Sequence, residues 1–425
     1  MEYVLLPNEI EMYVDTMKAQ NMECLGSPQW IEWHQRMQKL NQEALVEASA
    51  LKEERVKETL VCFGKVPILV HEAILISIWK QKILPQLMKL EPQPETTIVA
   101  YSIMYHEAVC VSLLELVLFH PNCCEALDDA ASDLLEYSCS NVSQLLVVEY
   151  KEQELHEKSE KEISRQKNNL VFEIGMKSLT LVRYISENLD SLPVGVKSKI
   201  FGDYDVPILF TEILTKAPWI RGDKIYSGGK WRDWDREQLG QQEAQVWLTI
   251  RQLILDPECP KYYSFTDRHR AQLMKLTSMM TPTLLDQLSP LIELKHWLCR
   301  LSVMENPSSA PKPLLIETVL DIKESILKQT EGRWKKLAKK QLPHVFPTDR
   351  ETLHELAGKL CEAYNTELLE KLEAKQDAKC ASCGKEAIQR CSRCHQVWYC
   401  GRQCQVDHWK EHSTDCSTNN SSVNS

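Results

Sequence analysis

Seven cysteines and one histidine form four closely spaced pairs within residues 380–416. Two or three residues separate the members of each pair. Such a pair can hold one metal ion from a tight turn or a first helical turn, and tetrahedral thiolate and imidazole ligands suit Zn²⁺. The spacing therefore predicts two zinc sites. The eight predicted ligands are Cys380, Cys383, Cys391, Cys394, Cys400, Cys404, His412 and Cys416.

In the predicted cross-brace, the first and third pairs hold one ion, and the second and fourth pairs hold the other. Four protein ligands at each ion leave no open position for a substrate, so both sites are expected to be structural. A unit this small cannot bury enough apolar surface to fold alone, and the metal has to supply the missing stability. His395 and His408 also lie in the module. His408 could replace His412, but its spacing to Cys416 is longer, and a surface position is expected for it.

The remainder of the chain has the composition of a helical protein. Only 13 glycines in 425 residues, with hydrophobic residues at 43%, favour packed helices over a turn-rich β architecture. Apolar residues recur at helical spacing, and proline or a capping residue stands at several helix starts. The predicted helices are 28–48, one beginning at Pro67, 95–120, 168–190, 206–217, 241–256, 267–280, 283–304, 312–330, 332–342 and 348–375.

One internal echo bears on the fold. Val66-Pro-Ile-Leu recurs as Val206-Pro-Ile-Leu, an offset of 140 residues. A proline in the first turn of a strongly apolar helix is typical of the third helix of armadillo-type repeats, and the offset fits three or four units of about 40 to 47 residues. We therefore predict a mainly α chain, a helical array of the armadillo or HEAT type, with an irregular helical bundle as the alternative. Either arrangement offers grooved surfaces to protein partners.

Three stretches interrupt the helical pattern. Residues 149–167 are dense in charge and are expected to form a solvated helix extension or a mobile insertion. Residues 218–236 combine aromatic residues with Gly228-Gly229, which predicts a loop or hairpin whose aromatic rings pack on their own domain. Residues 333–340 are basic and predict the solvated face of a surface helix; a nuclear-import signal or a surface for an acidic partner are the alternatives.

These patterns divide the chain into a helical body (1–374), a short polar linker (375–379), the zinc finger (380–416) and a Ser/Asn-rich tail (417–425) that we expect to be disordered. The net charge of −10 argues against general affinity for nucleic acid or anionic lipid. The nine other cysteines are scattered without paired spacing, which is typical of a reducing compartment. No secretory signal and no membrane span are expected, so we predict a cytoplasmic location.

The ligand pattern, with Tyr399 before Cys400 and Gln405 after Cys404, resembles the MYND zinc finger. The resemblance implies a protein-interaction domain, and several such fingers bind short proline-containing peptides. It also places the family's peptide groove at Ser392, Gln405 and Trp409. An indole one helical turn from an amide can hold a proline-rich strand, which has little entropy left to lose. The alternative is that Trp409 simply covers the zinc cluster.

The resemblance continues along nearly the whole chain to a family of MYND-finger proteins that serve as cytoplasmic assembly factors for axonemal dynein arms. Gly64-Lys-Val-Pro, Ile78-Trp-Lys-Gln-Lys, Thr283-Leu-Leu-Asp-Gln-Leu and Cys391-Ser-Arg-Cys carry it. It implies three kinds of partner: a leucine-rich-repeat protein, chaperones or co-chaperones, and dynein chains. It also implies a location in the cytoplasm, at centriolar satellites or near the bases of motile cilia.

Together these observations predict a non-enzymatic adaptor. The sequence contains no Gly-rich phosphate loop followed by Lys-Ser/Thr, and four histidines of the body lie singly on helical patterns, at expected packed or surface positions. These are His34, His71, His106 and His296. One alternative is a nuclear corepressor, which the basic run 333–340 supports. Another is a protein lysine methyltransferase, but no Asn-His-Ser-Cys-type cofactor segment is present.

Overall fold

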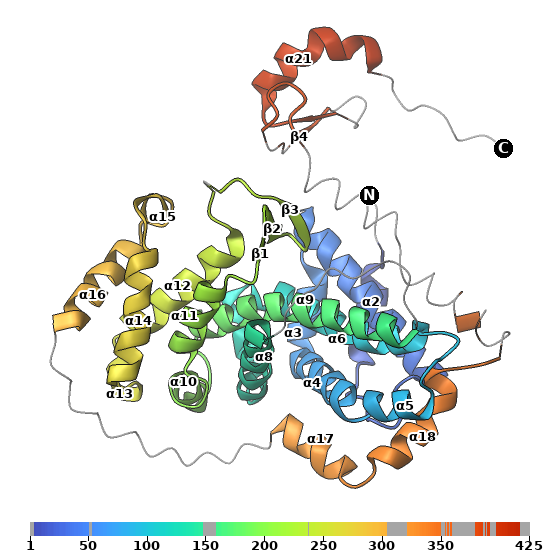
Figure 1. Cartoon of the computed structure of the whole chain (residues 1–425). Coiled ribbons are helices and arrows are strands. Elements are labelled where there is room, and N and C mark those ends of the chain that lie inside the picture. Colours follow the sequence, from blue (N-terminus) through green and yellow to red (C-terminus); the bar gives the residue numbers. More distant parts are fainter. Residues whose placement is uncertain are drawn as a thin grey trace. The chain divides into compact units, whose positions relative to one another are not determined.

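The computed structural model describes residues 4–50, 53–147, 159–236, 238–303, 321–349, 353, 355–356, 358, 379–385, 387, 389–391 and 397–416. Contacts divide the chain into two compact units, Met1–Lys359 and Leu360–Ser425, which we call the body and the finger unit (Figure 1). The predicted helix 348–375 and linker 375–379 lie almost wholly outside the described residues. The predicted tail 417–425 lies entirely outside them.

The described residues of the body form helices and one small sheet, and those of the finger unit form two short paired strands and a helix. In the first half of the body the elements are α1 (Pro7–Asp15), α2 (Pro28–Ser49), α3 (Arg55–Cys62), α4 (Val66–Lys82), α5 (Leu84–Leu90), α6 (Ile98–Leu118), α7 (Pro121–Cys124), η1 (Glu125–Leu127), α8 (Ala130–Val147) and α9 (Ser159–Glu187). In the second half they are α10 (Val194–Phe201), α11 (Val206–Lys216), β1 (Ile220–Arg221), β2 (Lys224–Ser227), β3 (Lys230–Asp233), α12 (Gln241–Leu255), α13 (Cys259–Tyr262), α14 (Asp267–Met279), α15 (Pro282–Gln287), α16 (Leu291–Val303), α17 (Ile322–Thr330) and α18 (Trp334–Val345). The finger unit has β4 (Gln389–Arg390), β5 (Trp398–Tyr399) and α21 (Arg402–Asp415).

The long helices of the body stack in two layers (Figure 1). In one layer α2, α6, α9, α12 and α16 each pack against the next, and in the other α4, α8, α11 and α14 do the same. The pairs α4–α6, α8–α9, α11–α12 and α14–α16 join the layers, and a short helix precedes each pair. A unit of one short and two long helices is thus repeated, and the predicted helical array is confirmed.

The repeat unit is longer than predicted. Helices α4, α8, α11 and α14 begin at residues 66, 130, 206 and 267, so neighbouring units are offset by more than 60 residues. The echo between Val66 and Val206 therefore spans two units, not three or four. Both segments do begin buried helices with proline in the first turn, where its missing N–H costs nothing. They are the second helices of their units, however, and not the third.

The predicted list of helices also needs correction, since α1, α3 and α10 were not predicted. Helix α8, which packs against both α9 and α4, was not among the predicted helices. The predicted helix 283–304 is two helices, because α15 ends at Gln287 and α16 begins at Leu291. Pro290 lies between them, and a proline in a helix interior removes a backbone hydrogen bond and clashes with the preceding turn.

The aromatic stretch 218–236 forms a three-stranded antiparallel sheet in the order β1-β2-β3. Tyr226 of β2 lies opposite Trp231 of β3, and both rings pack on Phe172 of α9, at centroid distances of 4.9 and 5.5 Å. Trp219 is almost fully buried. The prediction that these aromatic residues pack on their own domain is therefore confirmed. Of the charged insertion 149–167, the part before Ser159 lies outside the described residues, and α9 begins at that residue.

Helix α6 forms the centre of the body. It contacts α2, α4 and α9, and most of its side chains are buried. Among the described residues it is the one single helix long and apolar enough to cross a membrane, but 78% of its apolar stretch is buried inside the protein. Helix α3 together with the α4–α5 segment passes the same test only as a pair bent by 94°. We therefore interpret α6 as a core helix.

After α16 the chain returns to the first repeat units. Helix α17 packs on α4 and α8, and α18 packs on α5 and α6. The indole of Trp79 donates to the side-chain oxygen of Gln341 (2.9 Å), and the Gln341 amide donates to the carbonyl of Met22 (2.5 Å). Gly26 has a φ of +81°, and an added Cβ there would meet Val345 at 3.1 Å, so the position favours glycine. Residues far apart in sequence thus close the N-terminal end of the array.

A polar network lies buried between α2, α4 and α6. His34 and His106 are fully buried, so the packed positions expected for them are confirmed. Each stands singly on its helix, but their Nδ1 atoms lie 3.0 Å apart, a pairing that the sequence did not predict. Burial, and then the charge of His106, hold the pKa of His34 well below its usual value. His106 Nε2 also lies 3.5 Å from the buried carboxylate of Glu72. His71 and His296 lie at partly or fully exposed positions, as expected.

A buried ion pair continues this network. Lys80 of α4 pairs with Glu107 of α6, and the Glu107 side chain is fully buried. The Tyr137 hydroxyl of α8 donates to the other Glu107 oxygen at 2.7 Å. Because a buried charge is tolerated only when paired and hydrogen-bonded, the three groups fix how α4, α6 and α8 meet.

Candidate metal centre

One turn, a strand end and a helix bring the first group of cysteines together. Cys380 and Cys383 lie on the turn before β4, Cys400 directly follows β5, and Cys404 lies in the first turn of α21. The antiparallel pairing of β4 with β5 aligns these segments. As a result, the four sulfur atoms all lie within 4.8 Å of one another.

The local backbone explains how the first two thiols can face one point. The Cys380 N–H donates to the carbonyl of Lys385 (2.7 Å), and the Gly384 N–H donates to the carbonyl of Cys380 (2.8 Å). Gly384 adopts a φ of +73°, in the left-handed region that favours glycine. The turn therefore reverses the chain around both cysteines.

The spacing of the sulfur atoms fits zinc. The sulfur of Cys400 lies 3.5 Å from those of both Cys383 and Cys404. A tetrahedral Zn²⁺ with bonds of about 2.3 Å separates its sulfur ligands by roughly 3.8 Å. Hydrogen bonding with Cys383, and then with Cys404 and Cys380, raises the pKa of Cys400 to about 12. Burial opposes ionisation of Cys380, but hydrogen bonds from the backbone of Cys400, Cys383 and Ser382 lower its pKa to about 6. One thiolate is therefore stabilised in this group, and zinc binding releases the protons that the other thiols still hold.

The second group contains three described ligands. Cys391, His412 and Cys416 are all buried, their ligand atoms lie within 4.8 Å of one another, and the two sulfur atoms are 3.9 Å apart. Three such ligands make up all but one position of a tetrahedral zinc site. Cys394, the predicted fourth ligand, lies outside the described residues.

Tyr399 connects the two groups of ligands. Its ring is fully buried and belongs to one apolar cluster with Cys380, Cys391 and Cys416. Its hydroxyl lies 3.0 Å from Nδ1 of His408, whose imidazole stacks on that of His412 at 6.0 Å. His408 is therefore a hydrogen-bond partner of Tyr399 and is not part of either described ligand group. Sequence reasoning missed this role, although the spacing of the two histidines places them one helical turn apart.

The predicted peptide-binding residues on α21 lie at its surface. Gln405 is partly exposed and Trp409 is 37% exposed, one helical turn further along. The indole also contacts the imidazole of His412 edge-on, at a centroid distance of 5.8 Å. Trp409 therefore covers a predicted zinc ligand with one side of its ring and leaves part of the ring open to solvent. Ser392, the third predicted residue, lies outside the described residues.

Comparison with known proteins agrees with this geometry. The MYND finger family model matches residues 380–416, the segment that holds both ligand groups. The chain is also 34% identical to the zinc finger MYND domain-containing protein 10 homolog of Drosophila melanogaster, and the match covers 96% of this chain and 98% of the relative. The chain belongs to the family of zinc finger MYND domain-containing protein 10. Its C-terminal module is a zinc-binding MYND finger, a protein-interaction domain, as predicted.

Two further relatives match only a short part of this member of the zinc finger MYND domain-containing protein 10 family. Deformed epidermal autoregulatory factor 1 of Drosophila melanogaster is 42% identical over 41 residues, which is 10% of this chain and 7% of that protein. Histone-lysine N-methyltransferase ASHR1 of Arabidopsis thaliana is also 42% identical over 41 residues, 9% of this chain and 8% of that protein. No match to a solved structure was found.

Proposed function

We propose that this protein is a non-enzymatic cytoplasmic adaptor that helps to assemble axonemal dynein arms for motile cilia, with its MYND finger recruiting a short-motif protein partner. The full-length relationship to the zinc finger MYND domain-containing protein 10 homolog carries the proposal, because it extends over body and finger alike. The dynein-arm role follows from the family resemblance.

The chemistry of the finger supports an adaptor over an enzyme. Cys380, Cys383, Cys400 and Cys404 supply four thiolates to one ion, and four protein ligands leave a tetrahedral zinc without a position for substrate or water. The ion then acts as a structural cross-link. The part of α21 that carries Gln405 and Trp409 remains accessible for a peptide.

The body supports binding of a large client. Its stacked helix layers form an extended scaffold, and repeat arrays of this kind bind partners along their surfaces. We propose that the body binds dynein chains, chaperones or co-chaperones, and a leucine-rich-repeat assembly partner. We further propose that the protein acts in the cytoplasm, at centriolar satellites or in the apical cytoplasm near the bases of cilia.

Affinity capture from ciliated cells tests this function. Full-length protein is compared with a version that ends at Ala374 and so lacks the finger, and captured proteins are identified by mass spectrometry. We expect the full chain to capture dynein chains and chaperones, and the shortened chain to lose the partner that the finger recruits. Capture of neither class by the full chain would contradict the proposal.

The corepressor and methyltransferase alternatives are tested separately. The basic run 333–340 supports the corepressor, and two short relatives bear the names of a regulatory factor and a methyltransferase, but those matches cover a tenth of this chain or less. Nuclear accumulation in ciliated cells would favour the corepressor. Binding of S-adenosylmethionine in calorimetry would favour the methyltransferase, and we expect neither.

Replacing Trp409 with alanine is expected to weaken partner capture by roughly tenfold, because a partly exposed indole is a typical anchor for a peptide. The zinc content should stay unchanged, since Trp409 supplies no ligand atom. Lys410→Ala, an exposed neighbour on α21, is the matched control and should keep full capture. Undiminished capture by W409A would show that the indole only covers the zinc cluster.

A further inference from the structure

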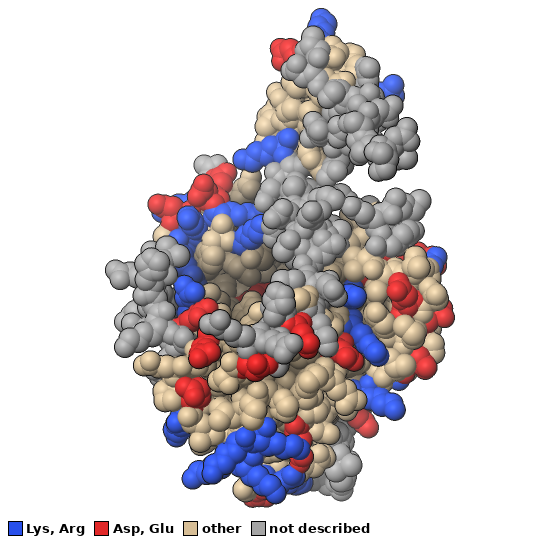
Figure 2. Space-filling view, turned by 90° about the vertical axis from the view of Figure 1, so that its right-hand side faces the viewer, with Lys and Arg blue, Asp and Glu red and all other residues tan. Residues whose placement is uncertain are grey.

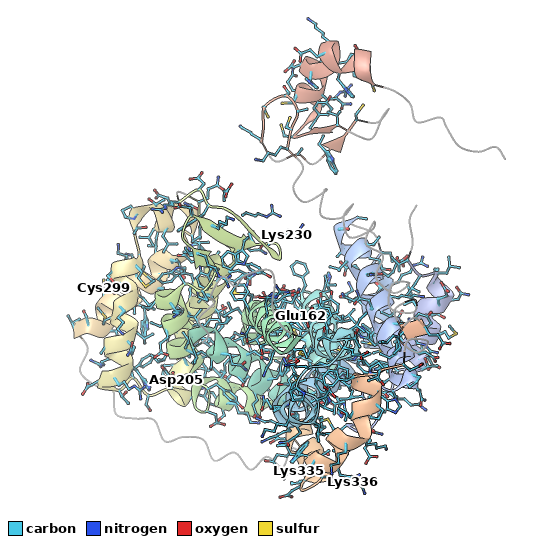
Figure 3. The ribbon with its side chains drawn as sticks, turned by 45° about the vertical axis from the view of Figure 1, so that its right-hand side comes forward. Glu162, Asp205, Lys230, Cys299, Lys335 and Lys336 are labelled. Atoms are coloured by element: carbon cyan, nitrogen blue, oxygen red, sulfur yellow. The ribbon has the colours of Figure 1, made fainter. Side chains whose placement is uncertain are left out.

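The outer side of α18 carries three exposed lysines, Lys335, Lys336 and Lys339, which we call the α18 lysine face. Figure 2 shows Lys and Arg side chains gathered at the lower end of the body, where α18 lies. In Figure 3 the labelled Lys335 and Lys336 extend outward from this end. Helix α5, which packs beside α18, adds the exposed Lys89. The concentration of positive charge stands out in a chain whose net charge is −10.

These lysines lack the acidic partners that some other surface lysines of the body have. Among the described residues, no carboxylate lies within the 4.0 Å ion-pair distance of any ammonium group of the α18 lysine face. Helix α18 itself contains no Asp or Glu. On the preceding helix α17, by contrast, Lys323 pairs with Glu136 and Lys328 pairs with Glu324. The α18 lysine face is therefore free to meet an external anion.

The positions of these lysines do not favour the stability of α18. Lys335 and Lys336 lie in its first turn, where the positive end of the helix dipole repels cations. Lys335 and Lys339 are one helical turn apart, and like charges at this spacing destabilise a helix. An anionic partner would relieve both repulsions.

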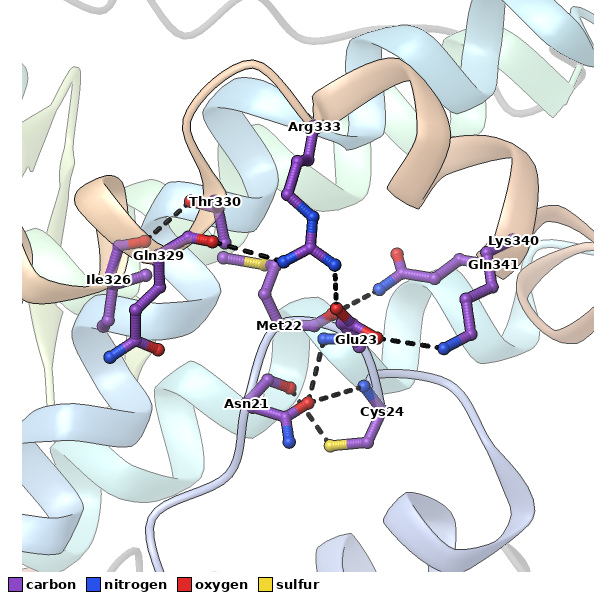
Figure 4. A network of polar contacts seen from close by, with 10 residues as sticks. All are labelled: Asn21, Met22, Glu23, Cys24, Ile326, Gln329, Thr330, Arg333, Lys340 and Gln341. Carbon is purple, nitrogen blue, oxygen red and sulfur yellow. Dashed lines mark hydrogen bonds and ion pairs between the residues drawn. The ribbon is translucent and has the colours of Figure 1, made fainter.

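Helix α18 is held firmly from its other side. Leu337 and Ala338 are buried, and Gln341 makes the buried hydrogen bonds described above. Figure 4 shows Glu23 bridging Arg333 and Lys340, which stand at the two ends of the cluster; the Lys340 contact is 3.1 Å. Hydrogen bonds from Lys340 and then Arg333 lower the pKa of Glu23. Because Glu23 pairs with these two flanking cations, it does not neutralise the charge of the α18 lysine face. The buried side of α18 holds the helix, and with it these lysines, in place.

We propose that the α18 lysine face binds an acidic segment of a protein partner. Charge complementarity selects an anion, and the preformed helix presents three ammonium groups along one face about 6 Å in length. Three cations are few for a nucleic-acid backbone, and the overall negative charge opposes approach to DNA, RNA or anionic lipid. This surface belongs to the body and does not depend on the finger or on the proposed role in dynein-arm assembly.

The test uses the full-length protein and a labelled oligoglutamate peptide, with binding followed by fluorescence anisotropy. The triple variant K335E/K336E/K339E is expected to weaken binding by roughly tenfold or more, because three attractive surface pairs become repulsive. The matched control K216E/K224E/K275E changes the net charge equally at exposed lysines outside α5 and α18 and should bind within about twofold of the unchanged protein. W409A should bind the peptide normally.

A structural role is separated by thermal unfolding. We expect K335E/K336E/K339E to melt at the same or a higher temperature, because acidic residues suit the first turn of a helix. If that variant does not fold, the neutral variant K335Q/K336Q/K339Q replaces it, and it is also expected to bind oligoglutamate more weakly than the unchanged protein. The proposal is overturned if the unchanged chain does not bind oligoglutamate. It is also overturned if K335E/K336E/K339E and the control K216E/K224E/K275E weaken binding equally. Tighter binding to duplex DNA or to phosphatidylserine vesicles than to the peptide, or self-association lost in the variant, would likewise overturn it.

Discussion

Replacing His412 with alanine is expected to release one of two bound zinc ions and to unfold the finger while the body stays helical. His412 is buried with Cys391 and Cys416, so its loss removes an imidazole ligand from a closed set. Structural zinc contributes on the order of 10 kcal/mol to the folding of such small modules, far more than their own core supplies. Elemental analysis of the purified protein measures the zinc content, and circular dichroism reports the helices of the body.

His408→Ala is the matched control, because it removes an imidazole from the same helix, one turn away. We expect this variant to keep both ions and to lose the stacking on His412 and the contact with the Tyr399 hydroxyl, the latter a change of about 1 kcal/mol. Two equivalents of zinc in H412A would contradict the assigned ligand. Loss of zinc in H408A would instead indicate that His408 is a zinc ligand.

Replacing Lys80 with methionine is expected to destabilise the body by about 3–5 kcal/mol, because it leaves a buried carboxylate without its cation. Glu107 is fully buried, and only the Tyr137 hydroxyl would then remain among the two contacts described for its oxygens. Urea unfolding followed by far-ultraviolet circular dichroism gives the change in the free energy of unfolding.

The double variant K80M/E107Q shows whether charge is the cause. It removes both charges while the glutamine oxygen can still accept from Tyr137, so most of the lost stability should return. If the double variant is as unstable as K80M alone, the loss comes from packing of the lysine stem and not from the unpaired carboxylate.

The sequence predicted the helical class and several helix starts because these depend on local signals. Proline in the first turn marked α2, α4 and α11 correctly. The length of the repeat unit was not predictable in the same way, because it is set by which helices pack against one another, and those contacts join residues far apart in sequence. The return of α17 and α18 was also missed, since Gln341 and Trp79 meet over a separation of 262 residues.

More structural detail could be predicted for the finger than for the body. Ligand spacing follows directly from metal geometry, so the grouping of Cys380, Cys383, Cys400 and Cys404 could be derived from the sequence. The contact between Tyr399 and His408 could not, because it depends on how α21 lies against β5. For the same reason the sequence left two roles open for Trp409, covering the zinc cluster and binding a peptide. In the structure the ring contacts His412 and is also partly exposed to solvent, where a peptide can reach it.

The docking of α18 onto the first helices has a consequence for synthesis of the protein on the ribosome. The N-terminal units emerge early, but the indole of Trp79 and the carbonyl of Met22 receive their partner only when Gln341 has been translated. Until then the nascent chain exposes the apolar surface that Leu337, Ala338 and Val345 later cover. A premature stop before α18 is therefore expected to leave this apolar surface of the N-terminal helices uncovered and to destabilise them.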